Sequence, residues 1–259
     1  MKAREIFEHL LSQALSVMSP TCDTLICGDP EKEVRLAATC FKLTAETLDK
    51  AIALGVDMII THEPTFAITD NPEDATFSDI RKWETLKNSG ITVYRFHDHA
   101  HHRACDYIHQ GFIDDTRLKI FQKYPAESMG IARYDLEEPM TARKLANIIK
   151  EQLDLDVVKI VGCDDAKIKT VCLGLGGVGF KQIQYLFDPG CDTFITGEVP
   201  EVKVCEYVRD SAYYGENKSI IILGHYSAEF SGMRLLAKEL DNGTVKCVYL
   251  DSKEVFKTV

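Results

Sequence analysis

The sequence predicts an α/β fold, and three observations support that prediction. Short apolar runs alternate with amphipathic stretches along the 259 residues, as expected for strands that alternate with helices. Hydrophobic residues make up 45% of the chain and charged residues 27%, which is typical of a folded globular protein. The third observation is an internal repeat, because the frame G-x-D-x-x-I-T-x-E occurs at two places in the chain.

In the first half of the chain, the alternation defines three helices and three strands. Residues 2–15 have the apolar spacing of an amphipathic helix. Thr44 and Gly55 provide the start and end signals of a helix over 44–54. The other expected elements are strands at 34–40, 57–61 and 91–97 and a helix at 77–89 that ends at Gly90.

The second half repeats this alternation. Thr141 can cap a helix over 141–153. The other expected elements are strands at 168–176, 192–196 and 219–224 and helices at 181–187 and 227–240. The polar stretch 122–128 is the expected seam, so we expect a first unit over 1–125 and a second over 126–259. The C-terminal segment is expected to pack back on the first unit.

The internal repeat aligns residues 55–63 with residues 190–198. The matched positions are Gly55, Asp57, Ile60, Thr61 and Glu63 in the first copy, and Gly190, Asp192, Ile195, Thr196 and Glu198 in the second. Each copy is followed by a helical stretch and then by a strand that ends in a histidine, His97 or His225. We interpret the repeat as two copies of one α/β unit with a shared site between them.

Charge and cysteine content exclude several classes of protein. Forty acidic residues against thirty basic ones give a net charge of −10, and no basic stripe is present, so no nucleic-acid partner is expected. No apolar run reaches the roughly 18 residues that a membrane span needs, and the N-terminus lacks the apolar core of a secretory signal. Nine cysteines without a C-x-x-C pair indicate reduced thiols in a cytoplasmic protein.

Four of the eight histidines lie between residues 97 and 102. In an extended strand, His97, His99 and His101 would share one face. Three imidazoles beside the carboxylate of Asp98 suit a first-row divalent metal. A polar loop at the end of a strand is the alternative, but such a dense histidine cluster in an acidic chain favours the metal site.

Two further pairs of potential ligands follow strands. His62 and Glu63 come directly after the strand at 57–61, at the strand end where α/β folds build their sites. His225 and Glu229 are four residues apart, so both side chains lie on one face of a helix. Each pair alone is a weak signal, but with the histidine cluster the two pairs predict a convergent site of histidines and carboxylates.

Two other motifs allow different chemistry. GLGGVG at 174–179 fits the dinucleotide pattern G-x-G-x-x-G, with Glu198 further along the chain, although a glycine-rich turn is the favoured interpretation. Cys105, close in sequence to His101 and His102, is the local candidate for a cysteine nucleophile, but nothing in the sequence indicates a lowered pKa for its thiol.

The segments GVDMIITHEP, HDHAH and GHYSAE resemble motifs of the Nif-three-like family of dinuclear-metal proteins. In that family the corresponding motifs are G-A-D-x-I-I-T-H-H-P, H-x-x-x-D and G-H-Y-x-x-E, and many members are labelled GTP cyclohydrolase type 2-like. The similarity covers residues 23–240. It implies two intertwined, duplicated α/β units with mixed sheets, a homohexamer, and two close metal ions bound between the units.

The resemblance also implies a set of metal ligands. The ligands carried over unchanged are His62, His225 and Glu229. Glu63 stands where the family has a second histidine, and His101 stands where it has an aspartate after the histidine that matches His97. A glutamate replaces a histidine at one position and a histidine replaces an aspartate at the other. The set of three histidines and two carboxylates is therefore unchanged. Asp98 is the alternative ligand in this segment.

Such a centre would hold two divalent ions, with Zn, Fe, Mn or Co suited to these ligands, and would hydrolyse a small, nucleotide-like substrate through a metal-bound water. Glu63 is the expected bridging carboxylate, and Tyr226 and Glu198 are candidates for proton transfer or substrate contact. The alternative is a non-enzymatic protein for metal binding, metal delivery or protein interaction, which the extra histidines His99 and His102 would suit. A third hypothesis is a nucleotide-binding oxidoreductase that uses GLGGVG.

Overall fold

The computed structural model describes residues 1–66, 77–125, 130–184 and 190–258. Contacts divide the chain into two units, Met1–Tyr107 with Gly232–Lys253, and Ile108–Ser231 with Glu254–Val259. The chain therefore passes from one unit to the other three times, so the units are intertwined. The seam expected at 122–128 and the boundary after residue 125 fall in part on 126–129, outside the described residues.

The first unit contains a five-stranded mixed sheet in the order β1-β4-β3-β2-β11. Its strands are β1 (Thr24–Cys27), β2 (Leu36–Cys40), β3 (Met58–Thr61), β4 (Thr92–Arg95) and β11 (Lys246–Tyr249). The edge strand β1 is antiparallel to β4, and all other pairings are parallel. The carboxyl ends of β3 and β4 therefore lie side by side at the same end of the sheet.

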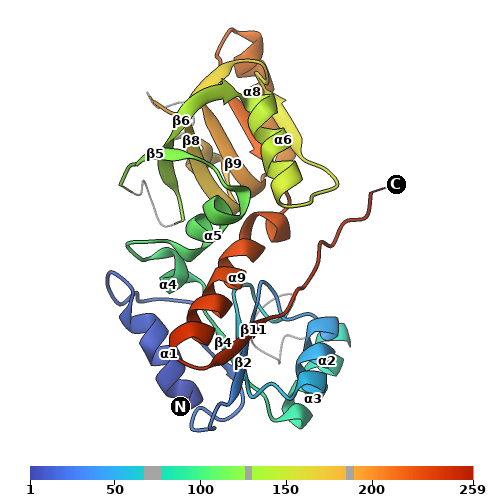
Figure 1. Ribbon diagram of the computed structural model, residues 1–259. Coiled ribbons are helices and arrows are strands. Elements are labelled where there is room, and N and C mark those ends of the chain that lie inside the picture. The colour runs from blue at the N-terminus through green and yellow to red at the C-terminus, as the bar shows by residue number, and fades with distance from the viewer. Residues whose placement is uncertain (67–76, 126–129, 185–189, 259) are drawn as a thin grey trace. The chain divides into compact units, whose positions relative to one another are not determined.

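Helices cover both faces of this sheet. They are α1 (Ala3–Ser12), α2 (Ala45–Leu54), α3 (Phe77–Ser89), the short α4 (Asp98–His101) and the part of α9 (His225–Gly243) that follows residue 231. Figure 1 shows α1 on one side of the sheet and α2 and α3 on the other. Because side chains alternate along a strand, Ile60 packs with Leu10 and Leu236 on one face, and Ile59 packs with Leu48 on the other.

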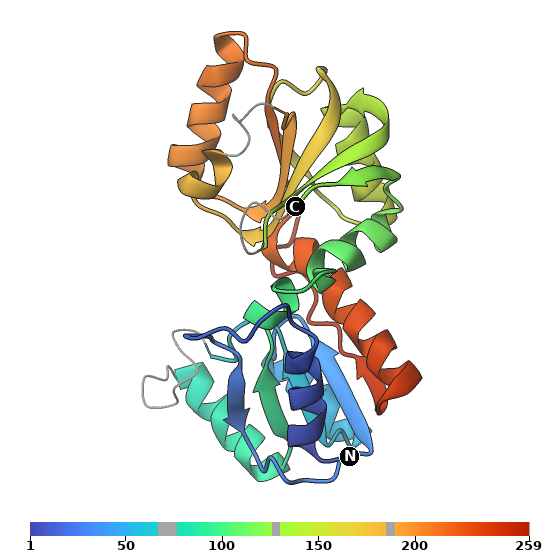
Figure 2. The ribbon, with the colours of Figure 1, turned by 90° about the vertical axis from the view of Figure 1, so that its left-hand side faces the viewer.

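The second unit contains a six-stranded mixed sheet in the order β5-β6-β8-β9-β10-β7. Its strands are β5 (Ile120–Lys123), β6 (Ala132–Thr141), β7 (Lys159–Gly162), β8 (Lys167–Gly177), β9 (Thr193–Glu198) and β10 (Ser219–Ile222). Its helices are α5 (Tyr107–Thr116), α6 (Ala142–Gln152), α7 (Phe180–Ile183), α8 (Glu201–Tyr213) and the start of α9. Strands β8, β9 and β10 run parallel, and Figure 2 shows helices on both sides of this sheet.

Both units are built on the same parallel core, as the internal repeat predicts. In the first unit, Oδ2 of Asp57 accepts the backbone N–H of Arg35 at 2.9 Å, just before β2. In the second, Oδ2 of Asp192 accepts the backbone N–H of Lys169 at 2.8 Å in β8. The repeated aspartate therefore ties the start of each central strand to its neighbour, which explains why the frame G-x-D occurs in both halves.

The strand registers refine the comparison of the two copies. The pairing of β3 with β4 and of β9 with β10 places Thr92 and Ser219 at equivalent positions. By this register His97 corresponds to Gly224, and His225 comes one residue later. Gly224 has a φ of +97°, so the second copy makes a turn at the position where the first copy carries its histidine. The expected match of His97 with His225 is wrong by one residue.

The predicted caps are present. The Thr44 side chain accepts the N–H of Thr47 before α2, Gly55 ends α2 with a φ of +69°, and Thr141 accepts the N–H of Lys144 before α6. Among the residues that the structure describes, no helix is long and apolar enough to cross a membrane.

Candidate metal centre

Residues 97–101 leave the sheet as one helical turn, because β4 ends at Arg95 and α4 starts at Asp98. In a helix, residues four apart lie on one side and residues two apart do not. His97 and His101 therefore face the same way, and His99 points elsewhere. The expected common face of all three histidines is wrong, because it assumed that the extended strand continues to residue 101.

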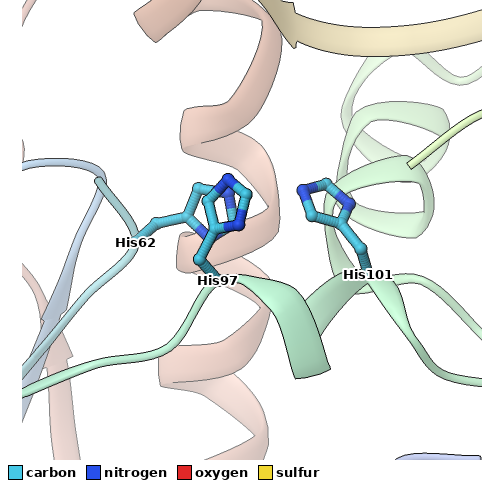
Figure 3. Close-up of side chains that lie close together, drawn as sticks. All are labelled: His62, His97 and His101. Carbon is cyan, nitrogen blue, oxygen red and sulfur yellow. The ribbon is translucent and has the colours of Figure 1, made fainter. Parts of the chain in front are cut away.

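His62 joins His97 and His101 in one cluster within the first unit. One ring nitrogen from each histidine lies within 4.8 Å of the others. The rings of His62 and His97 are stacked with centroids 4.4 Å apart, and the centroid of His101 lies 5.2 Å from each. Figure 3 shows the His101 ring turned toward the stacked pair. His62 is fully buried and His101 is 9% exposed, whereas the His97 side chain is 24% exposed, so the cluster is reached by solvent on the His97 side.

Each of these three rings makes a hydrogen bond through Nδ1 to an oxygen. The oxygens are the Phe96 carbonyl for His62 at 3.1 Å, the Asp98 carboxylate for His97 at 2.9 Å, and the Asp106 carboxylate for His101 at 2.9 Å. Because an oxygen of this kind can only accept, Nδ1 carries the proton and Nε2 presents a lone pair. Metal-binding histidines have this arrangement, so the donor set fits a divalent ion such as Zn, Fe, Mn or Co.

His99 is a structural histidine rather than an extra ligand. Its Nδ1 lies 2.6 Å from Oδ2 of Asp23, and its Nε2 accepts the backbone N–H of Met18 at 3.1 Å. Both ring nitrogens are therefore engaged within the protein. His102 lies apart from the cluster, with its Nε2 2.8 Å from Oγ of Ser16.

Glu63 and Asp98 have different environments beside the cluster. Oε1 of Glu63 lies 3.7 Å from Nε2 of His97, so a carboxylate oxygen lies next to this candidate ligand atom. Asp98 instead accepts hydrogen bonds from Oγ1 of Thr21 at 2.9 Å and from the backbone N–H of Cys22 at 3.0 Å. Burial opposes its ionisation, but the hydrogen bonds from Cys22, His97 and Thr21 are stronger together and lower the pKa of Asp98.

Cys22 also lies beside His97 and Asp98, with ligand atoms within 4.8 Å of one another. Burial raises the pKa of the Cys22 thiol to about 12. A metal ligand must be a thiolate, so metal binding by Cys22 would require this thiol to lose its proton. Asp98 is already bonded to the backbone of Cys22 and to Nδ1 of His97, so the cluster of three histidines is the better metal site.

The second unit carries its own histidine and carboxylate pair at the start of α9. Nδ1 of His225 lies 3.0 Å from Oε1 of Glu198, and Nε2 lies 3.3 Å from Oε2 of Glu229. The Glu229 side chain is 2% exposed, whereas that of Glu198 is 63% exposed. Glu198 is thus placed to orient His225, and Glu229 is a buried carboxylate next to its second nitrogen.

The GLGGVG segment packs against these residues. A Cβ on Gly177 would lie 3.3 Å from Oε1 of Glu198 and 3.7 Å from Cε1 of His225. The glycines therefore allow close approach of the backbone to the His225 region. Residues 174–177 form the end of β8, so the expected glycine-rich turn is wrong for most of the motif. The close approach to His225 accounts for these glycines without a dinucleotide.

The other candidate residues have simpler surroundings. The Tyr226 ring stacks on Phe230, with centroids 5.1 Å apart, and Cys105 is exposed. Asp23 and Asp106 were missed from the sequence. Asp106 gave a weak signal, because it lies five residues after His101, whereas the separation of Asp23 from the histidines hid its role.

Comparisons with known proteins agree on one family. A model of the Duf34/NIF3 (NGG1p interacting factor 3) family matches residues 1–254. A Clostridium acetobutylicum protein named GTP cyclohydrolase 1 type 2 homolog is 26% identical over 230 residues, which are 86% of this chain and 82% of that protein. A Clostridium perfringens protein of the same name is 25% identical over 253 residues, or 91% and 90% of the two chains.

Solved structures show the same fold. A Bacillus cereus protein related to NIF3 has a TM-score of 0.76 at 16% identity, with 100% of this chain and 99% of that chain covered. Reduced HcgD from Methanocaldococcus jannaschii has a TM-score of 0.75 at 18% identity, with 96% and 98% covered. At these identities the likeness concerns the fold alone.

Proposed function

We propose that this chain, which belongs to the Duf34/NIF3 family, is a metal-dependent hydrolase that acts on a small, nucleotide-like molecule. The observation that carries this proposal is the cluster of His62, His97 and His101, in which every Nδ1 is held by an oxygen. The name of the relatives, GTP cyclohydrolase 1 type 2 homolog, supports a nucleotide-like substrate.

The three histidines would hold a divalent ion through Nε2. A bound divalent ion polarises a substrate oxygen and lowers the pKa of water, which is the chemistry that hydrolysis needs. The carboxylate of Glu63, 3.7 Å from His97, can bind the same ion or accept a proton. His62 and His101 are buried, and burial strengthens the interaction of their ligand atoms with a cation.

A second ion is part of the proposal. The resemblance to the family adds His225 and Glu229 as ligands, and Nε2 of His225 lies 3.3 Å from Oε2 of Glu229 in the second unit. Glu198 would then orient His225, and Tyr226 would contact the substrate. The homohexamer, the cytoplasmic location and the absence of a nucleic-acid partner stay predictions.

Metal delivery without catalysis is less well supported. Metal delivery would be favoured by histidines beyond those needed as ligands. His99, however, is saturated by Asp23 and Met18, so it offers no nitrogen to a second ion.

The test is the metal content of the untagged protein, measured by elemental mass spectrometry after loading with Zn, Mn or Fe(II). We expect two ions per chain in the native protein and a loss of metal in His97→Ala. His102→Ala is the matched control, because His102 is bonded to Ser16 and should leave the metal count unchanged. The loaded protein is then assayed with GTP and other nucleotides for hydrolysis products. Protein that binds no metal, or that binds metal and hydrolyses no nucleotide, would contradict the proposal.

A further inference from the structure

Asp23 anchors the start of α4 across a long separation in sequence. Oδ1 of Asp23 accepts the backbone N–H of His97 at 2.5 Å and of Asp98 at 3.0 Å. Oδ2 accepts the backbone N–H of His99 at 2.7 Å and its Nδ1–H at 2.6 Å. The Asp23 side chain is completely buried, so water does not replace any of these four bonds.

A helix as short as α4 has little stability of its own. It spans only Asp98–His101, and the first N–H groups of any helix have no partner within the helix. A carboxylate at the start of a helix satisfies these groups and interacts favourably with the helix dipole. Asp23 does this for three successive N–H groups, and it also fixes the ring of His99 behind the turn.

The helical turn brings the two metal-binding histidines together. His97 and His101 are four residues apart, which is about 13 Å along an extended strand at 3.3 Å per residue. The same four residues rise about 6 Å in a helix at 1.5 Å per residue. In the structure the two ring centroids are 5.2 Å apart. If residues 97–101 were extended, His97 and His101 would therefore be too far apart to bind one ion.

Residues 21–23 and α4 are connected by hydrogen bonds in both directions. Asp98 of α4 accepts hydrogen bonds from Thr21 and Cys22, the two residues before Asp23. The same carboxylate accepts Nδ1–H of His97 at 2.9 Å and so fixes its tautomer. Residues 21–23 and α4 thus form a reciprocal clamp, with one aspartate from each side bonded to the other segment.

We propose that Asp23 is a positioning residue of the metal centre, which makes residues 97–101 helical and so assembles the His97 and His101 ligand pair. The inference rests on the proposed function, because it assumes that these histidines bind a metal. Asp23 itself would not be a ligand of the ion, because its oxygens accept hydrogen bonds from His99 and the backbone of α4.

The test compares Asp23→Ala and Asp23→Asn with the native chain. Co(II) is titrated into untagged, metal-free protein and its visible absorption is followed, because the spectrum reports the number and geometry of the ligands. We expect Co(II) to bind about 10- to 100-fold more weakly in both variants, as for other residues that orient metal ligands, with a changed spectrum. Hydrogen exchange of the amides of residues 97–99, without metal, should be slow in the native chain and fast in the variants.

Thr39→Val separates positioning from general stability. Oγ1 of Thr39 donates a buried hydrogen bond of 2.6 Å to the carbonyl of Met233, in the same unit, and this bond does not involve a residue of α4. This variant should lower the melting temperature and leave Co(II) affinity unchanged. An equal loss of affinity in Thr39→Val, or native affinity in both Asp23 variants, overturns the inference.

The two proposals fail in different ways. If the native chain binds no Co(II), the proposed function is wrong. If the native chain binds Co(II) and the Asp23 variants bind it equally well, only the positioning role is wrong. Fast exchange at residues 97–99 in the native chain also overturns the clamp, whatever the metal result and even where a variant fails to fold.

Discussion

Gly176 lies directly against the carboxylate of Glu229, so that a Cβ at Gly176 would be 2.3 Å from Oε1 of Glu229. The same Cβ would lie 3.2 Å from Nε2 of His225. No other residue type fits there without moving a candidate ligand. The central glycine of GLGGVG is therefore explained by the His225 and Glu229 pair, and a phosphate group is not needed to account for it.

Gly176→Ala should displace the Glu229 carboxylate and lower metal binding at least about 10-fold, in the range seen when metal ligands lose their orientation. Glu229 is almost fully buried, so its carboxylate has little room to move away. The measurement is metal content and affinity, together with the melting temperature.

Gly215→Ala is the matched control for this substitution. Gly215 has a φ of +93°, close to the +94° of Gly176, but nothing lies within 4 Å of its added Cβ. Both variants therefore share the backbone strain, of about 1–3 kcal/mol, and differ in the contact with Glu229. Equal loss of metal in the two variants would show that strain, and not the displaced ligand, is responsible.

Much of the fold could be predicted because the signals were local. The caps at Thr44 and Thr141 and the repeated G-x-D frame each depend on residues within a few positions of one another. Other elements carry weak local signals. Helix α8 buries only Val204 and Val208 among its described residues, and β6 contains the polar run before Pro139, so neither shows a clear apolar period.

The site was predictable as a set of residues but not as a geometry. The identity of the histidines follows from their motifs. The turn at α4, in contrast, depends on Asp23, and the spacing of His97, His99 and His101 fits a strand as well as a helix. Periodicity alone does not distinguish the two, because a contact between distant residues decides the conformation.

Glu63→Ala and His101→Ala test the proposed exchange of ligand types. If Glu63 and His101 together replace the usual histidine and aspartate, each single variant should lose bound metal. The His101 variant should be the more severe, because its Nδ1 is already oriented by Asp106 and its ring is buried. Metal analysis of the two variants gives the answer, and native metal content in both would remove them from the ligand set.

Removal of metal should lower the stability of the native chain. A ligand that binds only the folded state stabilises it by about 2.7 kcal/mol at a free concentration of 100 Kd. Thermal unfolding with and without a chelator should therefore show a clear decrease in melting temperature. His97→Ala should show little response to the chelator, because one of the three clustered imidazoles is missing. If the chelator leaves the melting temperature of the native chain unchanged, no bound ion stabilises the folded state.

Glu31 should make the folded state sensitive to acid. Hydrogen bonds from Arg4 at 2.9 Å and Lys2 at 2.8 Å lower the pKa of Glu31 from 4.5 to about 2. A carboxylate whose pKa falls on folding stabilises the native state above its unfolded pKa, and this contribution is lost as the pH falls toward the folded value. The difference in melting temperature between the native chain and Glu31→Gln should thus be largest above pH 4.5 and decrease toward pH 2.

The side chains of Glu31, Arg4 and Lys2 are exposed, so about 1 M salt should also reduce this difference in melting temperature. A difference that is constant from pH 2 to pH 6 would mean that the ion pairs do not set it.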